Sequence, residues 1–492
     1  MNILLASSEI VPFAKTGGLG DVCSALPKQI ARLGHEVCVF LPAFRTIYNA
    51  GVQIEPTGHE LSIPMGSKIV RGQILKSQLP DSTVSAYFID QPEYFGRKSY
   101  YGENGKDYDD NCERFIFFCR GVVEAIRSLQ LNVDLIHCND WQTGLIPAYL
   151  EIEYRKIPRF ERIATLMTIH NLAYQGRFWH WDMALTGLDW KYFNYQQMEF
   201  YDQVNLLKTG IVFADQISTV SQKYAEEIQT PEFGCGLEGV LADHRNRLSG
   251  ILNGVDYGDW NPACDSHLPA KYSVQNWRQG KAACKQHLQR EMGLPENDKA
   301  PLIGLIGRLA EQKGWDLIIE VIKSWARGLD VQWAILGTGE EKYHQELQDL
   351  VGMWPQKVAA NLGFSDQLAH QIEAGADMFL MPSQYEPCGL NQLYSLKYGA
   401  VPVVHETGGL ADTIVDTTPE TLAARTANGF SFRGFNTHNL QNALRRAMET
   451  YRDQPDQWAK IVETGMNQDW SWNKSAQQYV DLYQRTIRRR QV

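Results

Sequence analysis

The sequence lacks the features that would place the chain in a membrane or in a disulfide-rich secreted class. None of its apolar runs approaches the roughly 20 residues that a transmembrane helix needs. Its nine cysteines form no CxxC pair and no repeated spacing, so reduced thiols are expected. The first residues have no basic region and carry Glu9 within an apolar stretch, which disfavours a secretory signal. We therefore expect a cytoplasmic protein without a membrane partner.

An excess of basic charge is also absent. The chain carries 47 basic and 57 acidic residues, a formal net charge of −10, and this disfavours a nucleic-acid partner. Any bound anion must therefore be held by a local group of positive side chains. Hydrophobic residues make up 44% of the 492 residues, enough for large cores, and the length indicates two to four domains. The sequence carries no signal for the oligomeric state.

Short apolar runs alternate with helical patterns along the chain, which predicts parallel sheets whose strands are buried on both faces. Strands are expected at 2–7, 36–41, 84–89, 134–138, 163–169 and 216–220, and again at 302–307, 331–336, 358–362, 378–381 and 401–404. The stretch 256–301, rich in Pro, Asp, Asn and Lys, separates the two series. We predict an α/β fold with two Rossmann-like, doubly wound domains at 1–252 and 253–465, and a closing amphipathic helix within 466–492.

The tetrapeptide TGGL occurs twice, at 16–19 and 407–410, each time between an apolar strand and a helical stretch. In open α/β sheets, ligands bind beyond the carboxyl ends of strands, where backbone amides and helix N-termini can hold an anion. Glycine lets the backbone approach a phosphate closely, and Lys15 adds a positive charge. For one copy alone, a tight strand-to-helix turn explains the pattern equally well. Two copies, one per domain, favour a ligand held in a cleft between the domains.

Charged side chains follow two strands of the second series. Arg308 and Lys313 come after the strand at 302–307, and Glu386 comes after the strand at 378–381. Arginine offers a bidentate fork and lysine a point charge, a combination that suits a diphosphate. Glu386 is the candidate for acting on a substrate hydroxyl or a developing cation. The alternative interpretation of the basic pair is an exposed basic turn.

Polar residues also follow two strands of the first series. Asp140 lies after the strand at 134–138, and His170 and Asn171 end the strand at 163–169. Polar groups at neighbouring strand ends can line one site, although a single histidine is often only structural. The acidic stretch DYDD at 107–110 resembles a metal-binding carboxylate pair, but it precedes a helical stretch instead of following a strand. We interpret it as a solvated loop and expect no metal.

Aromatic residues gather in several places. Flat rings with a polar edge suit the apolar faces of sugars, although many of the aromatic residues must simply be core. The candidates for sugar contacts are Tyr100, Tyr101 and Trp179.

Seven motifs, spread in order over nearly the whole chain, resemble those of bacterial glycogen synthases and plant starch synthases. They are KTGGLGD at 15–21, HCNDW at 137–141, TIHN at 168–171, GILNGVD at 250–256, GRL with QKG at 307–314, PS with EPCGL at 382–390 and TGGL at 407–410. The resemblance implies a glycosyltransferase-B fold with an interdomain cleft and a C-terminal helix that returns to the first domain. It also implies retaining transfer of glucose from ADP-glucose to the non-reducing 4-OH of an α-1,4-glucan, without a metal or another cofactor. The nucleotide sugar and the glucan are thus the expected partners.

The same resemblance assigns roles to individual residues. By similarity, the residues at the diphosphate are Lys15, Gly18, Arg308 and Lys313, and Gly17 is a further substrate-binding residue. Those at the glucose and the reacting centre are Asp21, Asp140, His170, Asn171, Asn253 and Glu386. Those on the nucleotide side are Gly389, Leu390, Thr407, Gly408, Gly409 and Leu410. Tyr394 stands eight residues after Glu386, where the wider superfamily has a second glutamate that contacts the ribose. That ribose contact is therefore not expected to come from a carboxylate here.

The expected mechanism is front-face attack by the acceptor hydroxyl, with its proton passing to the leaving phosphate. Glu386 and the backbone carbonyl of His170 would stabilise the positive charge on glucose, and the basic side chains would stabilise the diphosphate. A Rossmann oxidoreductase is disfavoured, because no G-x-G-x-x-G directly follows the first strand. A non-catalytic glucan-binding or priming protein derived from this family is the alternative, and the presence of Lys15, Arg308, Lys313 and Glu386 disfavours it.

Overall fold

The computed structural model describes residues 1–103 and 105–491. The chain divides into two compact units, which we call unit 1 and unit 2. Unit 1 comprises Met1–Gly254 and the C-terminal segment that begins at Trp472, and unit 2 comprises Val255–Ser471. From the sequence, we predicted domain boundaries directly after residues 252 and 465.

Unit 1 is built on a nine-stranded sheet. In spatial order its strands are β14 (Leu248–Gly250), β13 (Gln216–Thr219), β9 (Ala164–Ile169), β8 (Leu135–Asn139), β1 (Asn2–Ala6), β2 (Glu36–Pro42), β5 (Ser85–Asp90), β4 (Lys68–Gln78) and β3 (Glu55–Met65). The strands from β14 to β5 pair in parallel, and β4 and β3 add an antiparallel hairpin at one edge. The six strands predicted for this half are confirmed to within one residue at each end, whereas the hairpin was not predicted.

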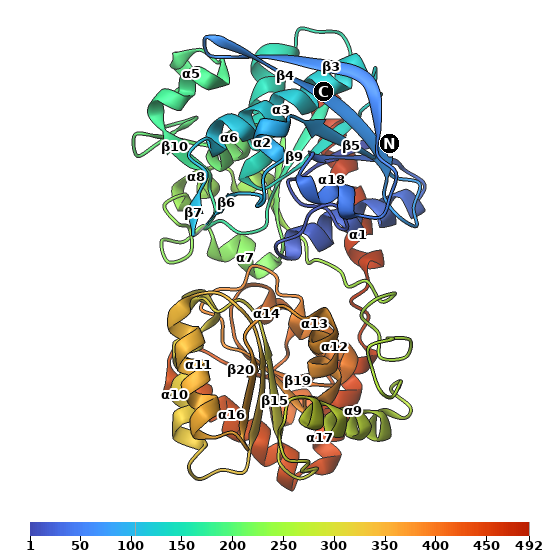
Figure 1. Cartoon of the computed structure of the whole chain (residues 1–492), viewed down its shortest axis with the longest axis vertical. Coiled ribbons are helices and arrows are strands. Elements are labelled where there is room, and N and C mark those ends of the chain that lie inside the picture. Colours follow the sequence, from blue (N-terminus) through green and yellow to red (C-terminus); the bar gives the residue numbers. More distant parts are fainter. Residues whose placement is uncertain (104, 492) are drawn as a thin grey trace. The chain divides into compact units, whose positions relative to one another are not determined.

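Helices cover both faces of this sheet (Figure 1). They are α1 (Gly18–Arg32), α2 (Pro92–Phe95), α3 (Asn111–Ser128), α4 (Leu145–Tyr149), α5 (Met183–Thr186), α6 (Leu206–Phe213), α7 (Gln222–Glu227), α8 (Glu238–Asp243) and α18 (Trp472–Gln491). Two small antiparallel sheets, of β10 (Arg177–Trp179), β12 (Gln203–Asn205) and β11 (Glu199–Phe200) and of β6 (Gly102–Glu103) and β7 (Lys106–Asp107), lie outside the main sheet. Alternate residues of β1 enter two different cores: Leu4 packs in the core that holds α3, and Ile3 in the core that holds α1.

The C-terminal helix α18 is part of unit 1 and packs against α1 and β9. Its buried face includes Ala476, Tyr479 and Tyr483, at the spacing of an amphipathic helix. The Tyr483 hydroxyl lies 2.8 Å from Nδ1 of His137, whose Nε2 lies 2.6 Å from the Thr168 hydroxyl. Burial lowers the pKa of His137 to about 3, so this histidine is neutral and joins α18 to the sheet through two hydrogen bonds.

Unit 2 is built on a six-stranded parallel sheet. Its strands, in spatial order, are β17 (Val358–Asn361), β16 (Gln332–Leu336), β15 (Leu302–Ile306), β18 (Met378–Met381), β19 (Val401–His405) and β20 (Phe430–Phe432). Its helices are α9 (Trp277–Glu291), α10 (Trp315–Trp325), α11 (Glu341–Met353), α12 (Asp366–Gly375), α13 (Asn391–Tyr398), α14 (Gly408–Thr413), α15 (Pro419–Ala423), α16 (Thr437–Asp453) and α17 (Pro455–Asn467). Helices α9, α12 and α13 cover one face of the sheet, and α10, α11 and α16 cover the other (Figure 1). The five strands predicted here are confirmed, again to within one residue.

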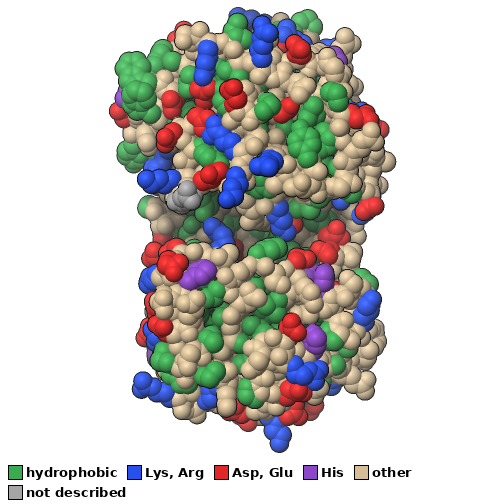
Figure 2. All heavy atoms as spheres, in the orientation of Figure 1, with side chains coloured by type: hydrophobic (Ala, Val, Ile, Leu, Met, Phe, Trp, Pro, Cys, Tyr) green, Lys and Arg blue, Asp and Glu red, His purple; other side chains and the backbone are tan. Residues whose placement is uncertain are grey.

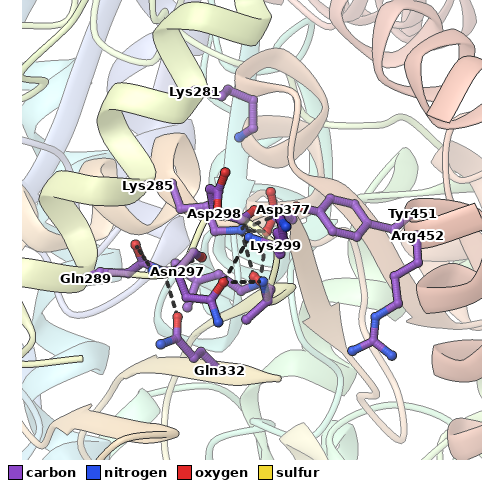
Figure 3. Close-up of polar contacts among 12 residues, drawn as sticks. Lys281, Lys285, Gln289, Asn297, Asp298, Lys299, Gln332, Asp377, Tyr451 and Arg452 are labelled. Carbon is purple, nitrogen blue, oxygen red and sulfur yellow. Dashed lines mark hydrogen bonds and ion pairs between the residues drawn. The ribbon is translucent and has the colours of Figure 1, made fainter. Parts of the chain in front are cut away.

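A buried ion pair ties α9 to the start of the sheet in unit 2 (Figure 3). Nζ of Lys285 lies 2.7 Å from Oδ2 of Asp377, and it also donates to the carbonyl of Ala300 at 2.7 Å and to the hydroxyl of Tyr451 at 3.3 Å. The same Asp377 oxygen accepts the backbone N–H of Leu302 at 2.9 Å. The pair therefore joins a helix to the residues that begin β15 and β18.

The face of the molecule in Figure 2 carries acidic and basic side chains interspersed with each other, in keeping with the modest net charge. Among the described residues, no helix combines the length and the apolar character needed to cross a membrane. All nine cysteines lie in the described part of the chain, and none of them forms a disulfide.

Candidate functional site

In unit 2, the predicted site residues follow three strands that are neighbours in the sheet. Strands β15, β18 and β19 lie side by side and in parallel, so their carboxyl ends meet at one edge. The basic residues follow β15, Glu386 follows β18, and the second TGGL loop follows β19. Ligands of doubly wound sheets bind at such an edge.

Lys313 and Glu386 form an ion pair at this edge. Nζ of Lys313 lies 2.6 Å from Oε2 of Glu386, and the hydroxyl of Ser383 donates to the same oxygen at 2.9 Å. Glu386 is only 6% exposed, whereas Lys313 is partly exposed. The carboxylate is thus held in one orientation by two donors, with little access to bulk water.

Arg308 is exposed, and its guanidinium contacts an uncharged side chain that is itself hydrogen-bonded to the backbone. Its Nη2 lies 3.2 Å from Oε1 of Gln312, and Nε2 of Gln312 donates to the carbonyl of Tyr385 at 3.0 Å. The carbonyl of Arg308 accepts the indole N–H of Trp315 at 2.8 Å. The backbone at Arg308 is therefore anchored to a buried tryptophan, while the guanidinium faces the surface.

The glycines of the second TGGL loop are required by the fold itself. A Cβ at Gly409 would lie 1.9 Å from the carbonyl oxygen of Cys388, and one at Gly408, where φ is +45°, would lie 2.0 Å from that of Glu386. The amide of Gly409 already donates to the Glu386 carbonyl at 3.0 Å. These glycines let the loop lie directly against the backbone that carries Glu386, so their observed role is support of the catalytic candidate.

The remaining residues of this edge differ in what they can offer a ligand. The side chain of Leu410 is buried in the core, whereas Gly389, at φ +69°, and Leu390 are partly exposed immediately before α13. Tyr394, which replaces the second glutamate of the wider superfamily, lies inside unit 2 and stacks on Trp260 with a ring separation of 3.9 Å.

Unit 1 presents a comparable edge, where β1, β8 and β9 are neighbours. Asp140 follows β8 with φ +57° and ψ −179°, a conformation that costs a non-glycine residue about 1–3 kcal/mol. Two hydrogen bonds maintain this backbone conformation. The N–H of Asp140 donates to the Thr168 carbonyl at 3.0 Å, and the Thr143 hydroxyl donates to the Asp140 carbonyl at 3.0 Å. Strain of this kind is concentrated at functional sites.

Asp140 and Asn139 together orient His170. Oδ1 of Asp140 accepts the backbone N–H of His170 at 2.7 Å, and Oδ1 of Asn139 lies 2.9 Å from the imidazole Nε2. Nδ2 of Asn139 donates to the carbonyl of Ala6 at 3.1 Å, so its oxygen accepts from His170 and Nε2 carries the proton. Burial lowers the pKa of His170 to about 3, and burial raises the pKa of Asp140 to about 7.

The first TGGL loop is held by Glu9. Its carboxylate accepts the amide of Thr16 at 2.5 Å and that of Gly17 at 3.3 Å, and it also accepts the hydroxyls of Thr16 at 2.6 Å and Tyr101 at 2.8 Å. The Tyr101 hydroxyl also lies 2.8 Å from that of Ser8. Two amides expected to face an anion are thus bound by an internal carboxylate, and Tyr101 uses its hydroxyl inside the protein.

The start of α1 nevertheless leaves room for a ligand. Gly17 is extended, and a Cβ placed there would meet nothing within 4 Å, so the fold does not require glycine at this position. The N-cap residue Gly17 makes no side-chain hydrogen bond to the first turn, which begins at Gly18. Nζ of Lys15 lies 2.8 Å from Oδ1 of Asp21, and both side chains are exposed beside this turn.

The other predicted residues of unit 1 are more dispersed. Asn171 accepts the amide of Ala173 through Oδ1 at 3.0 Å, and Asn253 is buried with an Oδ1 that has no hydrogen-bond partner among the described residues. Tyr100 lies 3.4 Å from the amide of Lys15 through its hydroxyl. Trp179 is 63% exposed, and Figure 2 shows hydrophobic side chains gathered at the edge of unit 1 where α5 lies in Figure 1.

Four positioning residues were not predicted from the sequence: Glu9, Asn139, Gln312 and Ser383. Asn139 and Ser383 lie inside motifs whose other members were assigned, so position next to a strand end could have identified them. Glu9 carried a weaker signal, an acidic residue in an apolar stretch. The acidic stretch at 107–110 uses Asp110 in an ion pair with Arg97, with Nη1 to Oδ1 at 2.7 Å.

Comparisons with known proteins agree on one family. A family model described as the starch synthase catalytic domain matches residues 2–243, and one described as glycosyl transferases group 1 matches residues 290–466. A glycogen synthase of Rhodopirellula baltica is 50% identical over 99% of this chain and 98% of its own, and one of Syntrophotalea carbinolica is 46% identical over 99% of both.

A solved structure extends this agreement to the fold. The catalytic domain of starch synthase IV from Arabidopsis thaliana, bound to ADP and acarbose, has a TM-score of 0.91 and 32% identity over 99% of both chains. The predicted glycosyltransferase-B fold and the predicted enzyme class are thereby confirmed, and no finding supports the non-catalytic alternative. The chain therefore belongs to the family of glycogen and starch synthases, glycosyltransferases that transfer glucose in the synthesis of glycogen or starch.

Proposed function

We propose that this glycosyltransferase takes glucose from ADP-glucose and adds it, with retention of configuration, to the non-reducing 4-OH of an α-1,4-glucan in the cytoplasm. The Lys313–Glu386 ion pair of 2.6 Å carries the proposal, because it joins a cation suited to the diphosphate to a carboxylate suited to the sugar. The starch synthase bound to ADP and acarbose supports a nucleotide and a glucan as the ligands. Nine cysteines without a disulfide support a reducing compartment.

On the donor side, Arg308 and Lys313 would stabilise the negative charge that develops on the diphosphate as the bond to glucose breaks. Preorganised charges aimed at a leaving group are among the largest contributions to catalysis. Lys15 and the N-terminal turn of α1 would add to this positive field. Because protein cations can neutralise the diphosphate, we propose that catalysis uses no metal or other cofactor.

On the sugar side, the reacting carbon gains positive charge, which Glu386 and the backbone carbonyl of His170 would stabilise. The neutral state of the His170 ring suits this role, because an imidazolium would repel the developing cation. Asp140 would act as a positioning residue, since its Oδ1 fixes the backbone N–H of His170. The new bond forms on the face from which the diphosphate departs, and the proton of the acceptor hydroxyl passes to the leaving phosphate oxygen.

The other predicted residues would contact the nucleotide, the glucose or the acceptor. Gly389, Leu390 and the 407–410 loop would contact the nucleotide mainly through backbone atoms, because Leu410 itself is buried. Asp21, Asn171 and Asn253 would contact the glucose hydroxyls. For the acceptor, Trp179 offers an exposed ring and Tyr100 a partly exposed one.

The decisive experiment incubates the purified chain with ADP-glucose or UDP-glucose and maltooligosaccharides, and measures nucleotide release and chain elongation together. We expect ADP release matched by elongation, an α-linked product by NMR, unchanged rates in the presence of a metal chelator, and strong loss of turnover in Glu386→Gln. Failure to elongate with either donor would refute the proposal, and trapping of a covalent glucosyl–Glu386 adduct would refute its mechanism.

A further inference from the structure

We propose that unit 2 binds one divalent transition-metal ion of the Zn²⁺ type through His267, Asp366 and His370. These side chains offer ligand atoms that all lie within 4.8 Å of one another. Among the described residues they form the only group of at least three His, Cys, Asp or Glu side chains close enough to hold a metal. None of the three belongs to the candidate catalytic site, so the inference goes beyond the proposed function.

The state of His370 is the strongest observation. Its side chain is fully buried, and Nδ1 lies 2.8 Å from Oδ2 of Asp265, a carboxylate that also accepts the Tyr398 hydroxyl at 2.6 Å. In the neutral imidazole with Nδ1 donating to Asp265, Nε2 presents a lone pair. Nε2 is buried and has no hydrogen-bond partner among the described residues, an arrangement that is costly unless something binds there. Histidines that bind metals are typically oriented by a carboxylate on the opposite nitrogen.

The other two ligands are placed to complete the site. Asp366 and His370 are four residues apart on α12, so they project from the same face of the helix. His267 comes from the segment before α9, with Nε2 4.0 Å from Oδ2 of Asp366 and its ring centroid 4.8 Å from that of His370. Tetrahedral zinc with bonds of about 2.0–2.1 Å needs ligand atoms roughly 3.4 Å apart. His267 is only partly buried and Asp366 is exposed, so small rotations of these two side chains close the site.

The chemistry of the donor set selects the kind of metal. Two imidazole nitrogens and one carboxylate suit Zn²⁺ and its transition-metal neighbours, whereas Mg²⁺ and Ca²⁺ prefer oxygen ligands. The ring of Trp260 stacks on His370 with a centroid separation of 3.8 Å, which fixes the imidazole on one side. A bound ion would clamp the segment that contains His267 to α12, and we therefore assign the metal a stabilising role.

The test titrates Zn²⁺ into the chelator-treated full chain, with a chromophoric competitor to measure affinity. We expect one equivalent to bind, the Tm to rise at saturation, and the Co²⁺-loaded protein to show the d–d absorption of a tetrahedral site. His267→Ala should abolish the Tm rise and weaken binding by at least about 100-fold, the upper end of what loss of an outer carboxylate costs. Because His267 is partly exposed, we expect the variant to fold, and its circular dichroism spectrum and Tm without metal check this.

Two further variants make the outcome unambiguous. Asp265→Asn should weaken Zn²⁺ binding about 10–100-fold, because it removes the group that orients His370. His438→Ala is the matched control, since it removes an exposed histidine of unit 2 on α16 and should leave binding unchanged. If His267→Ala binds Zn²⁺ as tightly as the wild type, or if His438→Ala weakens binding equally, the ion is adventitious and the proposal is wrong. Glucosyl transfer that is unaffected by the chelator leaves the proposed function intact in either case.

Discussion

Removal of Lys313 is expected to affect both catalysis and stability, because this side chain pairs with a buried carboxylate and is proposed to bind the diphosphate. Its Nζ is one of two donors to the buried Glu386 carboxylate, 2.6 Å away, and the other is the neutral Ser383 hydroxyl at 2.9 Å. In Lys313→Ala the Ser383 hydroxyl is the one donor to this carboxylate that remains among the described residues. Leaving such a group under-satisfied costs about 1–3 kcal/mol, and partial exposure of Lys313 favours the lower end of this range.

The expected loss of catalysis follows from the role that we propose for Lys313 at the diphosphate. Loss of one preorganised charge-stabilising donor costs about 2–4 kcal/mol of transition-state stabilisation, or roughly a 30- to 1,000-fold lower kcat/KM. Arg308→Ala should lose a similar amount of activity but change the free energy of unfolding by less than about 0.5 kcal/mol, because the Arg308 side chain is exposed. The two cations are therefore distinguishable by urea denaturation even though both lower activity.

The assay combines ADP release from ADP-glucose and maltooligosaccharide with urea denaturation of each variant. Lys323→Ala is the matched control: this lysine forms an exposed ion pair with Glu346 at 3.0 Å in the same unit, so its removal should cost less than about 1 kcal/mol and leave kcat/KM unchanged. Turnover like that of the wild type in either Lys313→Ala or Arg308→Ala would refute the reasoning.

The other expected outcomes concern the two glycine loops, the buried ion pair and one acidic side chain. Gly409→Ala should yield less soluble folded protein or less activity, because its Cβ would lie 1.9 Å from a carbonyl oxygen. Gly17→Ala should keep the wild-type Tm and show a raised KM for ADP-glucose. If the two variants have the same Tm and the same KM, the proposed difference between the loops is wrong. Asp377→Ala should lower the free energy of unfolding by about 3–5 kcal/mol in urea, because it strands the buried Lys285 ammonium. Burial raises the pKa of Asp140 from 3.8 to about 7, so the folded state holds a proton that the unfolded state has released over this interval. The contribution of this group to the free energy of unfolding is present below pH 4 and falls by up to about 4 kcal/mol as the pH rises through 7. Urea denaturation should therefore show a free energy of unfolding that decreases with pH in the wild type and decreases less in Asp140→Asn. An equal decrease in both proteins would contradict the assignment of this effect to Asp140.

The fold could be predicted where strands are buried on both faces. Such strands are continuous apolar runs, and each predicted run became a strand within one residue of its expected ends. The hairpin of β3 and β4 was not predicted, because one of its faces is exposed. In β3 the buried residues Leu61, Ile63 and Met65 alternate with exposed ones, a period-two pattern that a search for apolar runs does not detect.

The sites could be predicted only as far as strand ends allow. Residues that follow neighbouring parallel strands must lie at one edge, and this placed Glu386 with Lys313 and His170 with Asp140. The partners that hold these groups were harder to predict, because the contact of Glu9 with Tyr101 joins residues more than 90 positions apart. Only the folded chain brings such residues together.

Identical tetrapeptides can serve different purposes, as the two TGGL loops show. Near residue 408 the loop lies so close to the backbone of Glu386 that a side chain would clash with it, so close packing explains these glycines. At Gly17 the backbone is extended and the space around it is open, so packing gives no reason for glycine. A missing side chain without a structural reason is better explained by the approach of a ligand, and the first loop is therefore the stronger candidate for contact with the donor.

The strained backbone at Asp140 leads to the same kind of argument. Glycine would adopt φ +57° with ψ −179° at little cost, so the fold alone does not explain an aspartate there. The side chain provides what glycine lacks, an oxygen 2.7 Å from the backbone N–H of His170. Burial of that carboxyl adds a further cost, visible in its raised pKa. Two unfavourable features at one residue, both compensated by its hold on His170, indicate that the position of the His170 backbone is what this part of unit 1 is built to maintain.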